Sequence, residues 1–185
     1  MMQQENIGMA RVFCKEDRAL LEYTPTFWHP LAEKEPMHPV RRVRFMLEYL
    51  GKDAYRVYYY AVNGKTVGYC VAAPGGRRLK CSAKRDVVIG PYYIAPEFRT
   101  MGYGKAMLAE VLQHCTYPYE NAYLWIAKEN IPSARTATAC GFAPCGELTV
   151  TRYLRRLVPA HEGSHLVYGS SKERDIQAFC PDGRG

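Results

Sequence analysis

Residues 87–127 contain a strand-like run, a glycine-rich turn, an amphipathic helix and a second strand-like run, in that order. The run 87–94 consists mostly of β-branched and aromatic residues, which favour strands. In the segment 104–114, one helix face would carry Met107, Leu108, Val111 and Leu112. Residues 122–127 again have strand composition. A strand, a helix and a second strand in this order predict a parallel crossover, so the chain is expected to build an α/β sheet.

The turn that opens the helix reads Arg99-Thr100-Met101-Gly102-Tyr103-Gly104-Lys105. The first N–H groups of a helix have no intrahelical partner and carry about half a positive charge. Gly102 and Gly104 lack the Cβ atoms that would keep a phosphate away, and Lys105 adds a cation. We therefore predict that this turn cradles a pyrophosphate. The pattern is neither G-x-G-x-x-G nor G-x-x-x-x-G-K-[ST], so it does not support a dinucleotide fold or a P-loop.

Two segments together resemble the GNAT superfamily of N-acetyltransferases. The first is Ile89-Gly90-Pro91-Tyr92-Tyr93-Ile94, followed by Pro96-Glu97-Phe98-Arg99 and by Gly102 and Gly104. The second is Leu124-Trp125-Ile126, followed by Asn130 and by Gly141-Phe142. The resemblance implies a mixed, largely antiparallel central sheet with one parallel strand–helix–strand crossover and flanking helices. It also implies an enzyme that moves an acyl group, expected to be acetyl, from acetyl-CoA to a primary amine by direct attack in a ternary complex.

The resemblance assigns the contacts with acetyl-CoA or coenzyme A to ten residues: Ile94, Arg99, Thr100, Met101, Gly102, Tyr103, Gly104, Lys105, Asn130 and Ser133. By resemblance, the backbone of Ile94 would pair with the pantetheine amides and present an N–H to the thioester oxygen. In this family the strand before the glycine turn and the following strand, here 122–127, splay apart to admit the cofactor arm. Simpler roles remain open at this point. Ile94 also fits a strand core, Arg99 a cap on the turn, and Asn130 a helix N-cap.

One position departs from the family pattern. Many members carry a tyrosine seven residues after the asparagine, placed to protonate the departing thiolate, and this chain has Ala137 there. A thiol with a pKa of about 8.5 leaves without much help, so no replacement is compulsory. The attacking amine, in contrast, must lose a proton. The candidate bases are Tyr92, Asp86 and Glu129, and the alternatives are a core tyrosine, a charge at a strand entry and a solvated loop residue.

Residues 24–38 combine prolines with large aromatic residues and are predicted to form a loop. By resemblance, Phe27, Trp28 and His29 are expected to wall the acceptor site, although His29 also fits a loop-packing role. The acceptor is expected to be a small-molecule or peptide amine. Amino sugars, polyamines, small drugs, lysine side chains and peptide N-termini all remain possible.

The other elements are assigned by pattern. Strands are predicted at 10–14, 147–157 and 165–168, helices at 17–23, 39–50 and 131–140, and a hairpin at 55–62 and 66–73 with Asn63-Gly64 as its turn. Length predicts one domain, residues 1–169, and the polar segment 170–185 is expected to form a flexible tail.

Composition restricts the class of protein. The seven cysteines include no C-x-x-C pair, so neither a disulfide framework nor a metal site is expected. No signal peptide or membrane-length apolar run is present in the sequence, which predicts a cytoplasmic location without membrane contact. The net charge of +7 leaves nucleic-acid binding as a lesser alternative, with no nucleic-acid partner expected. A coenzyme A-binding module without transferase activity is a second alternative, and a homodimer is possible.

Overall fold

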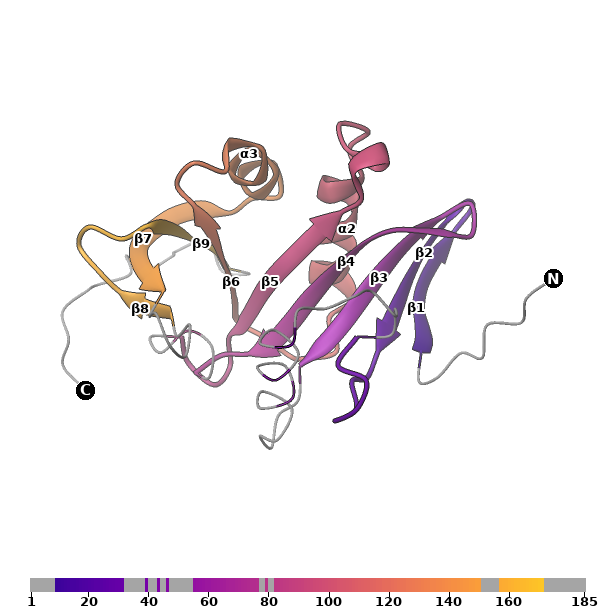
Figure 1. The fold of residues 1–185 in the computed structure, drawn as a ribbon, viewed down its shortest axis with the longest axis horizontal. Coiled ribbons are helices and arrows are strands. Elements are labelled where there is room, and N and C mark those ends of the chain that lie inside the picture. Colours follow the sequence, from indigo (N-terminus) through magenta and orange to yellow (C-terminus); the bar gives the residue numbers. More distant parts are fainter. Residues whose placement is uncertain are drawn as a thin grey trace.

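The computed structural model describes residues 9–31, 55–76, 82–150 and 157–171, together with Pro39, Val43, Met46 and Leu79. Within these residues the chain forms a single nine-stranded sheet, which carries the α-helices α2 (Tyr103–His114) and α3 (Ile131–Ala139) (Figure 1). Pro39, Val43 and Met46 are also helical. A short 3-10 helix, Pro96–Phe98, precedes α2. None of the described helices has the length and apolar character needed to cross a membrane.

The strands are β1 (Met9–Lys15), β2 (Arg18–Tyr23), β3 (Arg56–Val62), β4 (Lys65–Pro74), β5 (Val87–Ile94), β6 (Asn121–Ala127), β7 (Ala143–Val150), β8 (Leu157–Pro159) and β9 (His165–Ser171). Their order in the sheet is β1-β2-β3-β4-β5-β6-β9-β7-β8. Strand β5 is parallel to β6, and the other neighbouring strands are antiparallel. This mixed sheet with one parallel crossover confirms the predicted fold class.

The hairpin of β3 and β4 is confirmed, and its turn has the predicted chemistry. Asn63 has φ 49° and Gly64 has φ 73°, so both turn residues adopt the left-handed conformation of a type I′ turn. A local signal of two residues was sufficient here because the turn geometry depends on those two residues themselves.

The helix expected at 17–23 is wrong. Arg18–Tyr23 form β2, which pairs with β1 on one side and with β3 on the other. Leu20 and Tyr23 are buried in the cores on opposite faces of the sheet. The strand neighbours on both sides therefore override the weak helical preference of the segment.

The single long strand expected at 147–157 is also wrong. Strand β7 begins at Ala143 and ends at Val150, and β8 begins at Leu157 and runs back antiparallel to it. The predicted strand at 165–168 extends to Ser171 as β9, which lies between β6 and β7. Strand β9 thus includes two residues that were assigned to the tail, while residues 172–185 lie outside the described part. The same is true of most of the helix expected at 39–50.

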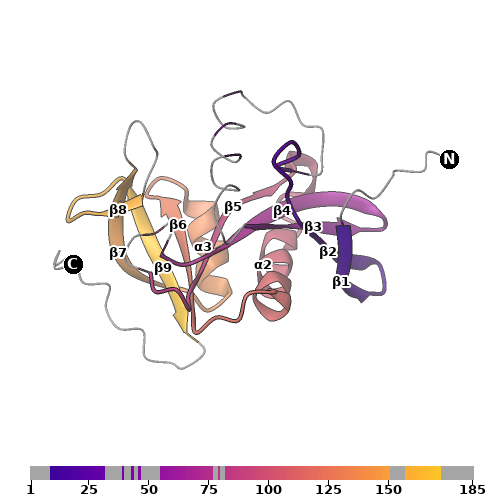
Figure 2. The same cartoon turned by 90° about the horizontal axis from the view of Figure 1, so that it is seen from below.

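Neighbouring residues of a strand point to opposite sides of the sheet, and each side of this sheet carries a buried core. Helices α2 and α3 cover one face (Figure 2). Met107, Leu108 and Ala137 from these helices belong to the same hydrophobic core as Tyr58 and Tyr60 of β3. The other face carries a second core, with Tyr23, Tyr55, Val57, Tyr59, Tyr69 and Val71. Residues 24–31 lie on this second face, since Leu31 packs into its core.

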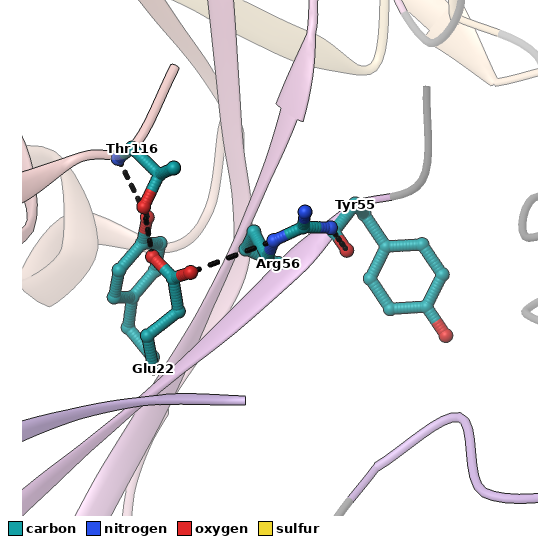
Figure 3. A network of polar contacts seen from close by, with 5 residues as sticks. Glu22, Tyr55, Arg56 and Thr116 are labelled. Carbon is teal, nitrogen blue, oxygen red and sulfur yellow. Dashed lines mark hydrogen bonds and ion pairs between the residues drawn. The ribbon is translucent and has the colours of Figure 1, made fainter. Parts of the chain in front are cut away.

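A polar network attaches the C-terminal end of α2 to β2 and β3 (Figure 3). The Thr116 hydroxyl donates to Glu22, and Glu22 forms an ion pair with Arg56 at 3.5 Å. The Thr116 N–H donates to the Tyr58 hydroxyl at 3.0 Å. Burial raises the pKa of that phenol. The network holds the far end of α2 and so helps to orient the helix whose N-terminus carries the glycine turn.

Candidate functional site

The parallel pair of β5 and β6 is short. In the described part of the chain it consists of Val87, Val88 and Ile89 opposite Ala122, Tyr123 and Leu124. Beyond these residues the two strands diverge, and Figure 1 shows them separating toward the end of the sheet that holds α3 and the start of α2. We call this open part of the pair the splay. The divergence that the family resemblance implied is therefore present.

The divergence starts at Gly90-Pro91. Gly90 has φ 127°, and a Cβ added to it would lie 3.4 Å from two carbons of the Trp125 ring. Pro91 has no N–H to donate to a neighbouring strand. Sequence reasoning did not assign a role to Gly90 or Trp125, although a Gly-Pro pair inside a strand is a recognised signal for a bulge or a close approach.

The backbone of Ile94 faces the splay. The Ala95 N–H donates to the Val67 carbonyl at 3.0 Å, so Ile94 and Gly68 form a non-hydrogen-bonded pair of the antiparallel ladder. The N–H and C=O of Ile94 therefore turn away from β4, toward the side of β6. The same alternation turns the N–H and C=O of Tyr92 in that direction.

The Arg99 side chain lies back over the end of β5. Its Nε donates to the Ile94 carbonyl at 3.1 Å, and its guanidinium carbon lies 5.7 Å from the centre of the Tyr93 ring. This is the capping role that was one of the two alternatives for Arg99. The Arg99 N–H is also in use, because it donates to the Pro96 carbonyl at 3.2 Å.

The glycine turn leads directly into α2. Thr100 has φ 66° and Gly102 has φ 80°, and both are exposed. The first hydrogen bond of the helix runs from the Ala106 N–H to the Gly102 carbonyl. The N–H groups of Tyr103, Gly104 and Lys105 consequently have no carbonyl below them in the helix and point out of its N-terminus. The geometry is suited to an anion.

Gly104 lies where α2, β5 and α3 meet. A Cβ added to it would lie 3.7 Å from Ile94 Cγ1 and 3.8 Å from Thr136 Cγ2. The thiol of Cys140, the C-cap residue of α3, also donates to the Lys105 carbonyl at 3.5 Å. Thr136 is thus a lining residue that sequence reasoning did not place in the cofactor site.

Asn130 forms the N-cap of α3, since its side-chain oxygen accepts from the Ser133 N–H at 3.3 Å. Tyr92 reaches the same helix from β5, and its hydroxyl donates to the Ser133 carbonyl at 3.2 Å. Burial raises the pKa of the Tyr92 phenol. The structure therefore brings together Tyr92, Ile94, Gly104, Ser133 and Thr136, from three elements, around the splay.

Two candidate bases lie at opposite ends of the sheet. Asp86 precedes β5 and is roughly 26 Å along the strand from Ile94. Its buried carboxylate accepts from the Ala83 N–H at 2.6 Å and from Asn121 Nδ2 at 3.0 Å, so it holds the loop that precedes β5 and does not reach the splay. Glu129 is exposed and follows β6, at the edge where β5 also ends.

Ala137 is fully buried in the core between α3 and the sheet. The neighbouring hydroxyls on α3 are committed to the helix itself, because Thr136 donates to the Pro132 carbonyl and Thr138 to the Ala134 carbonyl. Burial raises the pKa of the Cys140 thiol. Both threonine hydroxyls next to Ala137 are therefore already bonded within α3.

Residues 24–31, which we call the aromatic loop, are held on the face of the sheet opposite α2. The Tyr23 hydroxyl donates to the His29 carbonyl at 2.7 Å, and the Tyr55 hydroxyl donates to the Pro30 carbonyl at 2.9 Å. The Phe27 and Trp28 rings pack edge to face with their centres 5.0 Å apart, and Trp28 remains 67% exposed. His29 contacts Thr26 within the same turn.

The comparison with protein families gives one match. The model of the Acetyltransferase (GNAT) family matches residues 19–142, which is more than half of the chain. The chain belongs to the GNAT acetyltransferase family. This GNAT match includes β5, the glycine turn, α2, β6 and α3. Comparison with the sequences of curated proteins finds no significant match.

Two solved GNAT acetyltransferase structures have a similar fold. One is spermidine N-acetyltransferase from Vibrio cholerae in complex with CoA and spermine, with a TM-score of 0.54 and 16% identity over 76% of this chain and 80% of that chain. The other is the microcin C7 self-immunity acetyltransferase MccE in complex with acetyl-CoA and AMP, with a TM-score of 0.55 and 14% identity over 85% and 93%. At this identity the likeness concerns the fold.

The burial of Ala137 predicts the effect of restoring the family tyrosine. Ala137→Tyr would force a large ring into a packed core and should lower the free energy of unfolding by roughly 1–3 kcal/mol or more. Ala139→Tyr places the same side chain at an exposed position of the same helix and should cost less than about 0.5 kcal/mol. Urea unfolding followed by circular dichroism measures both. Equal stability of the two variants would contradict the buried position of Ala137.

Proposed function

We propose that this protein is an acetyl-CoA-dependent N-acetyltransferase that transfers the acetyl group to a primary amine by direct attack in a ternary complex. The observation that carries the proposal is the splay, where backbone N–H and C=O groups of β5 that point away from β4 meet the open N-terminus of α2. An extended polar arm that ends in a phosphate fits this combination of features. Acetyl-CoA has such an arm and supplies the activated acyl group.

The residues around the splay fit the donor at both ends. The N–H groups of Tyr103, Gly104 and Lys105 would hold the pyrophosphate, with Thr100, Met101 and Gly102 forming the turn around it. Ile94 would pair with the pantetheine arm on the β5 side. Asn130 and Ser133 would line the arm on the α3 side, in addition to the capping bond between them.

The N–H groups that face the splay also provide the electrostatic part of the chemistry. Charge develops on the thioester oxygen as the amine attacks, and an N–H already fixed in a strand can stabilise it without rearrangement. Both Ile94 and Tyr92 present an N–H on this side of β5. We propose that one or both form the oxyanion site.

The acceptor would approach from the face that carries residues 24–31. Helices α2 and α3 cover the donor face, whereas Phe27, Trp28 and His29 lie on the other face together with Tyr93. The two substrates would then meet where the sheet opens. Tyr92 and Glu129 are the candidate bases at this edge, with bulk water as a further proton acceptor, since Asp86 lies at the opposite end of β5.

The alternative of a coenzyme A-binding module without transferase activity is favoured by one observation, the alanine at position 137. An acceptor panel separates the two functions. Purified protein is mixed with acetyl-CoA and with polyamines, amino sugars, lysine peptides and free peptide N-termini, and thiol release is recorded. Amine-dependent release supports the transferase, whereas tight acetyl-CoA binding without release by any amine supports the binding module.

The cradle assignment predicts that a larger side chain at Gly104 blocks the donor. Gly104→Val would place methyl groups between Ile94 and Thr136, and the dissociation constant for acetyl-CoA should rise roughly tenfold or more. Calorimetry measures this change. Ala109→Val makes a similar addition at an exposed position of α2 and should leave the affinity within about twofold. Wild-type affinity in a folded Gly104→Val protein would disprove the assignment.

The acceptor assignment predicts a different kinetic pattern for the aromatic loop. Trp28→Ala should raise the KM for the amine about tenfold, equivalent to roughly 1.4 kcal/mol, while the acetyl-CoA affinity stays within about twofold. Val158→Ala, which truncates an exposed apolar residue on β8, serves as the control. A parallel loss of acetyl-CoA affinity in Trp28→Ala would show that Trp28 supports the fold of the site and does not contact the acceptor.

A further inference from the structure

The position of Tyr92 suggests a role that differs from that of a base. Strand β5 sends Tyr92 to the face covered by α3, and its hydroxyl ends at the Ser133 carbonyl. Ser133 and Ala137 are one turn apart, so they lie on the same side of α3. The phenol is therefore beneath the helix surface that contains Ala137, although it comes from a different element.

The hydrogen bond of the Tyr92 phenol is easily exchanged. Its length is 3.2 Å, whereas hydroxyl donors in proteins are most often 2.7–2.8 Å from their acceptors. The Ser133 carbonyl also lies inside α3, where the helical pattern supplies the Ala137 N–H as its regular donor. Loss of the phenol would therefore leave that carbonyl satisfied. The Tyr92 proton can turn toward an acceptor in the splay at small cost.

The protonation state of the Tyr92 phenol suits a proton donor. Burial raises the pKa of Tyr92 above its usual value of 10, so the phenol keeps its proton at neutral pH. A group in this state cannot take a proton from the attacking amine, but it can give one to a thiolate. This is a physical reason to remove Tyr92 from the candidate bases.

We propose that Tyr92 is the catalytic acid, which protonates the sulfur of the departing coenzyme A. This inference rests on the proposed transferase function. The amine nitrogen forms a bond to the acyl carbon, the carbon–sulfur bond breaks, and the sulfur takes the phenolic proton as coenzyme A leaves as a thiol. The nitrogen releases one proton to Glu129 or water, and a solvent proton restores the phenol. The reaction as a whole converts a thioester and an amine into an amide and a thiol.

Tyr92→Phe tests the contact without the need for turnover. A phenol that donates to sulfur stabilises the thiolate, so the thiol pKa of coenzyme A bound to the wild-type protein should lie below that of the variant. The expected difference is about one unit or more, measured by the ultraviolet absorbance of the thiolate in the binary complex. Tyr119→Phe is the matched control, because that hydroxyl also donates to a helix carbonyl but lies at the far end of α2. It should leave the thiol pKa unchanged.

Turnover provides the second measurement. With the best amine of the acceptor panel, Tyr92→Phe should lower kcat about a hundredfold, while the dissociation constant of acetyl-CoA stays within about twofold. Equal thiol pKa values together with an unchanged kcat would overturn the proposal. If the wild-type protein releases no thiol with any amine, the transferase function itself fails, and a retained thiol pKa difference would still show the contact.

Replacement of Tyr92 by 3,5-difluorotyrosine tests the proposal without a change in packing. The fluorinated side chain has nearly the same size as tyrosine and keeps the hydroxyl, and only its acidity differs strongly. An acid must be protonated to act, so its activity falls as pH rises through its pKa. The wild-type protein should show no such fall below pH 10. The more acidic fluorinated phenol should bring a descending limb below pH 10. A fluorinated protein with the wild-type pH profile would exclude Tyr92 as the acid.

Discussion

The site depends on the short hydrogen-bonded contact between β5 and β6. Three residues of each strand pair, and then Gly90, Pro91 and the Trp125 ring accompany their separation. If the pairing continued, β6 would take up the outward-facing N–H and C=O groups of Tyr92 and Ile94. Because it stops, these groups remain at the edge where α2 begins and α3 caps the opening. The candidate functional surface is thus made of backbone that the sheet leaves without a strand partner.

The separation also determines how the two faces of the sheet are used. Both helices pack on one face, and the aromatic loop is tied to the other face through Tyr23 and Tyr55. At the splay, a group bound on the helix-covered face could come close to a group bound on the face of the aromatic loop. The Thr116 network holds α2 at its C-terminal end, and the hydrogen bond from the Cys140 thiol to the Lys105 carbonyl holds it near its N-terminus. These contacts keep the open N–H groups of α2 beside the splay.

Proton transfer in such a site is limited by which groups reach it. Asp86 is occupied at the wrong end of β5, the threonines of α3 bond to their own helix, and Ala137 fills core volume that a tyrosine would need. Tyr92 enters the same region from the strand. A phenol supplied by β5 instead of α3 would combine the acid with the backbone N–H that faces the thioester, on a single rigid residue.

Local sequence determined the parts of this protein whose geometry is set by a few neighbouring residues. The Asn63-Gly64 turn, the glycine turn before α2, the Asn130 cap and the helix–strand alternation of residues 87–127 all belong to this group. Tertiary structure decided the rest. Residues 18–23 became a strand because β1 and β3 flank them. The single strand expected at 147–157 became parts of β7 and β8, because β8 runs back along the side of β7 that faces away from β9. Asp86 lies away from the splay because β5 separates the two. The position of Tyr92 under α3 was equally undetermined by sequence, since it depends on where two separate elements cross and no pattern along the chain encodes that distance.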